Sequence, residues 1–187
     1  NESGPVITLA EQETMLKKVE SLAQPEDWWV LSGSLPRGVP DNYYADIIER
    51  VQRAGGYAVL DTSGEPLRQG CAARPYLIKP NAMEAEELTG IPVTSPEDAE
   101  EALAAIHELG VEHVFISFGK DGALLSAGEE RWLATPPTIE ESNPIGAGDS
   151  AVAGLMWALS GGLSPEDCLR WGVACGAAAA SLPGTAV

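Results

Sequence analysis

A glycine-rich segment that ends in an aspartate carries the strongest chemical signal in the sequence. The segment Asn143-Pro144-Ile145-Gly146-Ala147-Gly148-Asp149 stands directly before an apolar stretch with helical character. Its two glycines let the backbone curl, so that successive N–H groups converge at the start of the helix and form an anion hole. In phosphoryl transfer, the Asp149 carboxylate can accept the proton of the attacking hydroxyl while the amides stabilise the transferring negative charge. A plain capped helix start, in which glycine and aspartate are ordinary, is the structural alternative.

Two other motif interpretations fit this segment less well. The run from Gly146 to Ala151 matches the GxGxxA pattern of dinucleotide folds, but that pattern needs a hydrophobic strand before it and an acidic strand end about 20 residues later. Ser150 as a hydrolase nucleophile needs a nearby histidine base, whereas the sequence holds only His107 and His113 and has no GxSxG motif around Ser150. The sequence also lacks the GxxxxGK[ST] pattern of P-loop nucleotide hydrolases.

Strands and helices alternate along the chain, which predicts an α/β fold. Short apolar runs typical of strands occur at 28–32, 57–60, 76–78 and 113–118, with shorter ones at 124–125 and 132–133. Helical patterns lie around 16–23, from a cap at Asp41 to Gly55-Gly56, and over 82–89, 97–109, 147–160 and 165–181. This alternation favours one unit with a mainly parallel sheet and helices on both faces.

Polar or glycine-rich residues follow four of the predicted strands. These sets are Ser32-Gly33-Ser34, Asp61-Thr62-Ser63-Gly64, Lys79-Pro80-Asn81 and Ser117-Phe118-Gly119. In sheets of this kind, ligands bind beyond the carboxyl ends of the strands. We therefore expect these sets to surround the functional site.

Composition limits the possible partners. The 187 residues are enough for one domain, or one domain with part of another, and the 44% apolar and 21% charged content is typical of a globular protein. With 11 basic and 28 acidic residues, the net charge of −17 makes nucleic acid and membrane surfaces improbable partners. No secretory signal is visible, which favours the cytoplasm. A local pocket of amides can still bind a small anion.

Together the motifs resemble the PfkB carbohydrate kinases of the ribokinase-like fold, in particular their 1-phosphofructokinase and tagatose-6-phosphate kinase branch. The resemblance covers almost the whole chain and rests on five motifs in the family's order and spacing. They are Ser32-Gly33-Ser34-Leu35-Pro36-Arg37-Gly38-Val39, Asp61-Thr62-Ser63-Gly64-Glu65, Lys79-Pro80-Asn81 with Glu84, the segment from Ser117 to Gly122, and Gly146-Ala147-Gly148-Asp149.

The resemblance implies a role for each motif. Asp149 becomes the catalytic base, and the amides that form the anion hole are assigned to Gly146, Ala147 and Gly148. Gly33 and Ser34 fall on the sugar-phosphate side of the site, and Asp61 lies near them at a strand end.

The nucleotide side of the site is assigned in the same way. Lys79 and Asn81 are implied to contact the phosphates of ATP, and Asn81 with Glu84 to order Mg²⁺ and its waters. A solvent-exposed acidic helix face is the structural alternative for Glu84. The remaining implied nucleotide contacts are Ser117, Gly119 and Gly122 in a loop, and Gly176 in the helix that lines the adenine pocket.

The function implied by the resemblance is ATP-dependent phosphorylation of a sugar monophosphate to a bisphosphate. Kinases of an unphosphorylated sugar or nucleoside, or a non-catalytic nucleotide-binding module, are the alternatives. Pro144, where many members have Ser or Thr, bears on the subgroup and leaves it open. Because the family domain extends before Asn1, we expect residues 1–187 to be the C-terminal portion of the kinase domain. The missing part is expected to contain the β lid, through which a homodimer would form, so we expect the isolated chain to be inactive.

Overall fold

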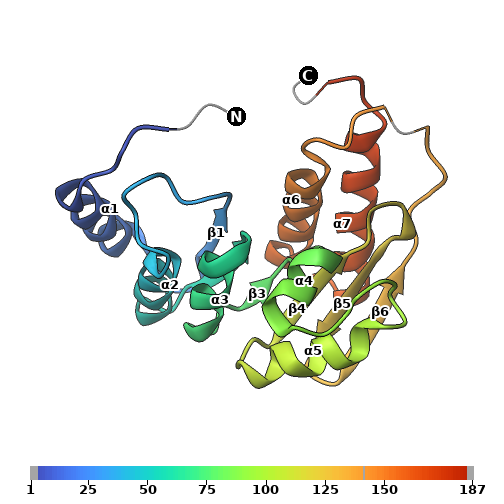
Figure 1. The fold of residues 1–187 in the computed structure, drawn as a ribbon, viewed down its shortest axis with the longest axis horizontal. Coiled ribbons are helices and arrows are strands. Elements are labelled where there is room, and N and C mark those ends of the chain that lie inside the picture. Colours follow the sequence, from blue (N-terminus) through green and yellow to red (C-terminus); the bar gives the residue numbers. More distant parts are fainter. Residues whose placement is uncertain (1–3, 141, 185–187) are drawn as a thin grey trace.

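The computed structural model describes residues 4–140 and 142–184 and consists of a six-stranded sheet with helices on both faces (Figure 1). The strands are β1 (Trp28–Ser32), β2 (Tyr57–Asp61), β3 (Leu77–Ile78), β4 (His113–Ser117), β5 (Ala123–Ala127) and β6 (Glu130–Ala134). The helices are α1 (Leu9–Leu22), α2 (Tyr43–Arg53), α3 (Gly64–Ala72), α4 (Ala82–Thr89), α5 (Ala99–Glu108), α6 (Ala147–Ser160) and α7 (Pro165–Ala180), and a short 3₁₀ helix, η1, spans Gly119–Asp121. Among these helices, none has the length and apolar content needed to cross a membrane.

The sheet is mainly parallel, as the sequence predicts. Its strands are ordered β1 to β6 in chain order, with β1 to β4 parallel and β5 and β6 antiparallel. Ser32 pairs with Asp61 at the ends of β1 and β2, and Leu60 pairs with Ile78 on β3. The carboxyl ends of four neighbouring strands therefore lie along one edge of the sheet, where the polar sets follow them.

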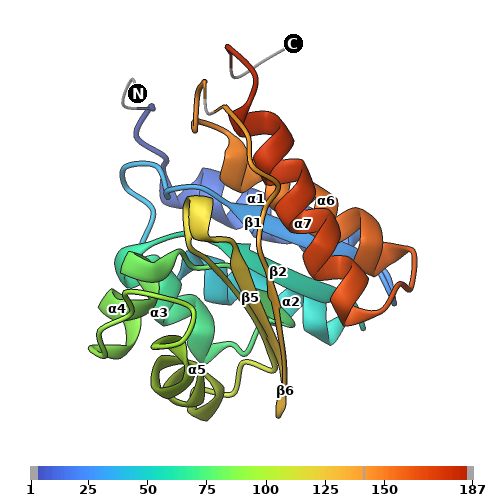
Figure 2. The same ribbon diagram turned by 90° about the vertical axis from the view of Figure 1, so that its right-hand side faces the viewer.

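Alternation along the strands divides the core into two clusters. In β2, Val59 packs in the cluster that contains Phe115 and Leu155, whereas the next residue, Leu60, packs with Ile48 on the other face. Helices α6 and α7 cover the first face, while α3, α4 and α5 lie across the sheet from them (Figure 2). Helix α1 packs against α2.

Two local predictions differ from the structure. Asp41 does not cap α2: the N-cap position belongs to Asn42, and the Tyr43 N–H donates to the carbonyl of Pro40 in a turn that includes Asp41. Helix α3 was not predicted, because its sequence contains proline and two glycines, which are poor helix formers. Packing overrides that weakness, since Gly70 lies so close to Leu60 that a side chain there would overlap it.

Helices α6 and α7 pack closely, and this contact positions the first turn of α6. A Cβ atom on Gly154 of α6 would lie 2.5 Å from the Trp171 carbonyl oxygen and 2.7 Å from the Cys175 Sγ atom of α7. A Cβ atom on Gly176 of α7 would lie 3.2 Å from the Ala147 carbonyl oxygen, in the first turn of α6. The small residues of both helices thus let their backbones approach, as the sequence suggests.

The Gly154 contact generates a test of this packing. In an ordinary helix, replacing glycine with alanine adds stability of about 1 kcal/mol. Here we expect Gly154→Ala to lower the free energy of unfolding by about 1–3 kcal/mol, because the added methyl group overlaps the backbone of α7. Urea denaturation measures this change, with exposed Ala153→Gly as a control that costs only about 1 kcal/mol of helix propensity. A stabilising Gly154→Ala substitution would contradict the account.

Candidate active site

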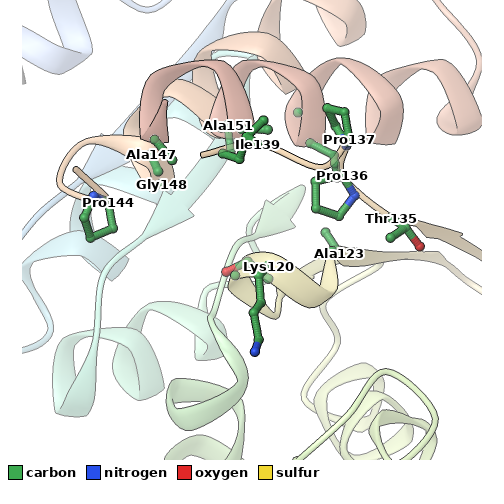
Figure 3. A pocket seen from close by; sticks show the side chains of 18 of the residues that line it. Lys120, Ala123, Thr135, Pro136, Pro137, Ile139, Pro144, Ala147, Gly148 and Ala151 are labelled. Carbon is green, nitrogen blue, oxygen red and sulfur yellow. The ribbon is translucent and has the colours of Figure 1, made fainter. Parts of the chain in front are cut away.

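A pocket lies between the carboxyl edge of the sheet and helices α6 and α7. Its volume is about 510 Å³. Pro144 and Gly148 lie toward one end of the pocket and Thr135 toward the other, with η1 below the helices (Figure 3). The lining is mostly apolar between these ends, where Phe115 and Val173 contribute. A pocket with an apolar body and a polar end suits a ligand with one flat and one charged portion.

The first turn of α6 forms the polar end. Gly146 stands at the N-cap with a φ of 85°, a left-handed conformation that glycine adopts without strain. The Ala147 N–H donates to the Pro144 carbonyl at 3.2 Å. Within residues 4–140 and 142–184, the N–H groups of Gly148 and Asp149 make no hydrogen bond. These two amides, together with the helix dipole, can bind an anion.

A buried ion pair lies beside this turn. The Lys79 Nζ atom is 3.0 Å from Asp61 Oδ1, and only 7% of the Lys79 side chain and 15% of the Asp61 side chain are exposed. The pair forms because Asp61 ends β2 and Lys79 directly follows β3. The Lys79 backbone N–H donates to the Leu60 carbonyl at 3.1 Å, which holds the two residues side by side. Lys79 Nζ also lies 3.7 Å from the place that a Cβ atom of Gly148 would occupy. The ammonium group therefore lies against the start of α6.

Asp61 is influenced by both of its charged neighbours. Burial raises the pKa of the Asp61 carboxyl above its ordinary value, the Lys79 ammonium opposes this shift, and the Asp149 carboxylate adds to it. Asp149 itself is exposed at the end of the site. The three side chains thus form one electrostatic group around the first turn of α6.

Asn81 and Glu84 start helix α4 next to this group. They form a capping box, in which the Glu84 N–H donates to Asn81 Oδ1 at 2.9 Å and the Asn81 N–H donates to Glu84 Oε2 at 2.8 Å. Asn81 also pairs with Ser117 at the end of β4, which brings α4 to the pocket. The structural alternative for Glu84 was a solvent-exposed face, and the side chain is in fact partly buried.

The loop after β4 turns sharply along the pocket. The Phe118 N–H donates to the Gly122 carbonyl at 2.8 Å, and the Gly122 N–H donates to the Gly119 carbonyl at 3.2 Å. Gly122 has a φ of 102°, and a side chain there would overlap the Ala134 carbonyl. The loop therefore both turns the chain into β5 and lines the pocket.

The structure brings together about half of the residues predicted for the site. Those that line the pocket are Lys79, Ser117, Gly119, Gly122, Ala147, Gly148 and Gly176. Gly146, Asp149, Asn81 and Glu84 lie on the elements just described, next to the lining residues.

Gly33 and Ser34 lie farther along the edge, at the end of β1. The Gly33 N–H donates to the Asp61 carbonyl at 2.9 Å, and the Gly33 carbonyl accepts from the Thr62 hydroxyl at 2.7 Å and the Tyr44 hydroxyl at 3.0 Å. Ser34 is exposed beside them. These contacts hold Gly33 next to Asp61, but neither Gly33 nor Ser34 lines the pocket.

Sequence analysis missed the segment that closes the apolar side. Residues 135–139 all line the pocket, and Figure 3 labels Thr135, Pro136, Pro137 and Ile139 among the lining side chains. Two consecutive prolines indicate an extended segment, but only the fold shows which surface it covers.

Comparison with known proteins identifies the family. The family model described as pfkB family carbohydrate kinase matches residues 4–187. The chain belongs to the pfkB family of carbohydrate kinases. The expected family resemblance and ribokinase-like α/β fold are thereby confirmed.

Individual relatives agree with this assignment. The chain is 38% identical over 180 residues to 1-phosphofructokinase of Bacillus subtilis, a match that covers 96% of the chain and 59% of the relative. Phosphofructokinase-2 from Escherichia coli in complex with fructose-6-phosphate has a TM-score of 0.89 and 31% identity, with 96% and 59% covered. Arabidopsis thaliana ribokinase complexed with ribose and ATP has a TM-score of 0.76 and 26% identity, with 97% and 55% covered. The pfkB chain thus spans less than two thirds of the length of each.

The position of Lys79 predicts an effect on nucleotide binding. We expect Lys79→Gln to raise the Kd for ATP by about tenfold or more, because a charged hydrogen bond to phosphate is lost. Lys17 is exposed on α1 and does not line the pocket, so Lys17→Gln is a control that should change the Kd by less than about threefold. Isothermal titration calorimetry on the full-length protein measures both. Equal effects of the two substitutions would contradict the placement of phosphate beside Lys79.

Proposed function

We propose that the protein is an ATP-dependent kinase that phosphorylates a hydroxyl of a sugar monophosphate to give a bisphosphate, as a 1-phosphofructokinase-like enzyme. The observation that carries this proposal is the placement of Lys79 and Asp149 at the first turn of α6, at the polar end of the pocket. The B. subtilis relative, by its name, and the E. coli relative, by its bound fructose-6-phosphate, support a phosphorylated sugar as the substrate.

In the proposed reaction, Asp149 acts as the base. Its carboxylate takes the proton of the sugar hydroxyl while the hydroxyl oxygen forms a bond to the terminal phosphorus of ATP, and the bond from that phosphorus to the bridging oxygen of ADP breaks. The Gly148 and Asp149 amides stabilise the charge on the transferring group. The exposure of Asp149 leaves room for a sugar to approach from the outer side of the turn.

The rest of the pocket suits the nucleotide. Its apolar portion, next to Gly176, can accept the adenine ring. The glycines of the loop from Ser117 to Gly122 allow the backbone of that loop to pass close to the phosphates. Lys79 offers its ammonium group to the phosphates at the polar end. The sugar would lie toward Gly33 and Ser34, outside the pocket.

Mg²⁺ is proposed as the metal cofactor. The described part of the chain holds no group of three acidic, histidine or cysteine side chains at metal-binding distance. Mg²⁺ commonly keeps several waters and binds through one or two carboxylates plus substrate phosphates, and the hard oxygens of Asn81 and Glu84 fit that kind of site. When bound, Mg²⁺ supplies charge neutralisation for the phosphates. Glu84 and Asn81 would orient its waters from the start of α4.

Kinases of an unphosphorylated sugar are the second candidate, which the likeness to a ribokinase complexed with ribose favours. Comparing fructose 1-phosphate, fructose 6-phosphate and tagatose 6-phosphate with ribose and fructose in one ATP-dependent assay distinguishes the candidates. Turnover with the free sugars alone would favour the second.

The position of the chain in a longer kinase domain, its homodimer and its cytoplasmic location remain predictions.

The proposed base generates a direct test. We expect Asp149→Asn in the full-length protein to lower kcat by about 10²-fold or more, because the proton acceptor is lost while the volume is kept. The Kd for ATP should stay within about twofold, because solvent screens the charge of the exposed Asp149 side chain far more than that of the buried Asp61. The free energy of unfolding should fall by less than about 1 kcal/mol, the worth of one acidic residue at a helix start. Steady-state kinetics, calorimetry and urea denaturation measure these values.

Two outcomes would count against the assignment. Turnover close to that of the wild type would remove Asp149 from the role of base. A loss of stability large enough to unfold the variant would favour the alternative in which this aspartate only supports the helix start.

Glu84 permits a test of the metal proposal that leaves the helix start intact. In Glu84→Gln the side-chain oxygen can still accept from the Asn81 N–H, so the capping box survives while the charge is lost. We expect the Mg²⁺ concentration for half-maximal activity to rise by about threefold or more. Glu87→Gln, at an exposed position of the same helix, is the control. An unchanged titration in Glu84→Gln would restrict Glu84 to capping.

A further inference from the structure

Lys79 and Asp61 form a buried ion pair beside the position where we expect a phosphate of the ligand to bind. Of the carboxylates in the described part of the chain, only that of Asp61 lies within ion-pairing distance of Lys79 Nζ. The same ammonium group lies against the first turn of α6. A phosphate bound by the Gly148 and Asp149 amides would therefore meet Lys79 while Lys79 is paired with Asp61.

Without a ligand, Lys79 needs Asp61. The start of a helix carries a partial positive charge, which repels a cation placed next to it. A buried ammonium group without a counter-ion is costly, and either loses its proton or moves toward water. The Asp61 carboxylate, 3.0 Å away, offsets both effects and holds Lys79 at the end of the pocket.

With a ligand, the same carboxylate becomes a cost. Its negative charge lies next to the incoming phosphate and competes with it for Lys79, while Asp149 adds a further negative charge nearby. Burial already raises the pKa of Asp61, which indicates how poorly water compensates its charge there.

We propose that Asp61 is the resident counter-ion of Lys79 and competes with ligand phosphate for it, so that Asp61 holds Lys79 in place in the empty site and weakens phosphate binding. The inference rests on the proposed function, because it assumes that a nucleotide phosphate binds at the first turn of α6. Such competition favours release of the phosphate-bearing product, a step that limits the turnover of many enzymes.

Asp61→Asn is the decisive variant. Asparagine has nearly the same volume, and its Oδ1 atom can still accept from Lys79 Nζ, but the competing charge is gone. We expect its Kd for ATP and for ADP to be lower than that of the wild type by about fivefold or more, where about fivefold corresponds to the Coulomb energy of two close charges in bulk water. The Kd for adenosine, which has no phosphate, should be unchanged. Isothermal titration calorimetry of the full-length protein at one fixed Mg²⁺ concentration measures all three.

Two controls separate the local charge from other effects. Glu108→Gln removes one exposed negative charge from α5 and should leave the Kd for ATP within about twofold. Asp61→Glu keeps the charge and should not reproduce the tightening. Asp61→Ser is a second neutral variant, which should tighten ATP binding in the same direction if Asp61→Asn folds poorly.

Thermal stability gives an independent readout. The empty Asp61→Asn protein should have a lower Tm than the empty wild type, because Lys79 loses its counter-ion. Saturating ATP should raise the Tm of the variant more than that of the wild type, since phosphate then replaces the lost charge. Adenosine should not have this larger effect.

Three results would overturn the inference. The first is ATP binding in Asp61→Asn that is equal to or weaker than in the wild type, and the second is an equal tightening for adenosine. The third is a wild-type protein that binds no ATP, which would overturn the proposed function and this inference with it. In the first two cases the wild type binds ATP, so the proposed function stands while the competition fails.

Discussion

The ion pair between Lys79 and Asp61 requires three elements to meet at one edge of the sheet. Asp61 ends β2, Lys79 follows β3, and the first turn of α6 lies against the ammonium group. The first two meet because parallel strands in register bring their carboxyl ends side by side. The third depends on α6 packing closely on α7, where Gly154 leaves no room for a larger residue and Gly176 makes a tight contact with the first turn of α6. The charged site is thus a consequence of backbone packing on both sides of it.

The packing of α6 on α7 leaves an apolar pocket along the two helices and a polar region at the start of α6. Along α6 and α7, small residues and Phe115 leave a pocket whose apolar walls would favour a flat apolar group by burial. At the start of α6, free amides and Lys79 favour negative charge. The strongly acidic surface does not oppose this, because the attraction is local and the Lys79 side chain is almost fully buried. A ligand that carries both a ring and phosphates satisfies the two parts at once, which is why a nucleotide suits this site.

Much of this arrangement could be predicted from the sequence, because strand ends and glycine-rich turns have local signals. The segment that ends at Asp149 and the residues after the strands are of this kind. Contacts set by tertiary structure had no such signal: α3 forms against Leu60 despite glycine and proline, and residues 135–139 find their place only once α6 and α7 are present. Asp61 and Lys79 are 18 residues apart in the chain, and their pairing depends on the register of β2 and β3, which periodicity alone cannot give. The roles predicted for all of the site residues, from Gly33 and Ser34 to Asp149, stay predictions.

The central claim is that phosphate binds at the first turn of α6. Backbone amide NMR of the full-length protein, titrated in parallel with ATP and with adenosine, tests it most directly. The account predicts that the Gly148 and Asp149 amide signals shift strongly with ATP and little with adenosine, while signals of Val173 and Gly176 shift with both. Gly148 and Asp149 signals that stay unchanged with ATP, or that shift equally with adenosine, would contradict it.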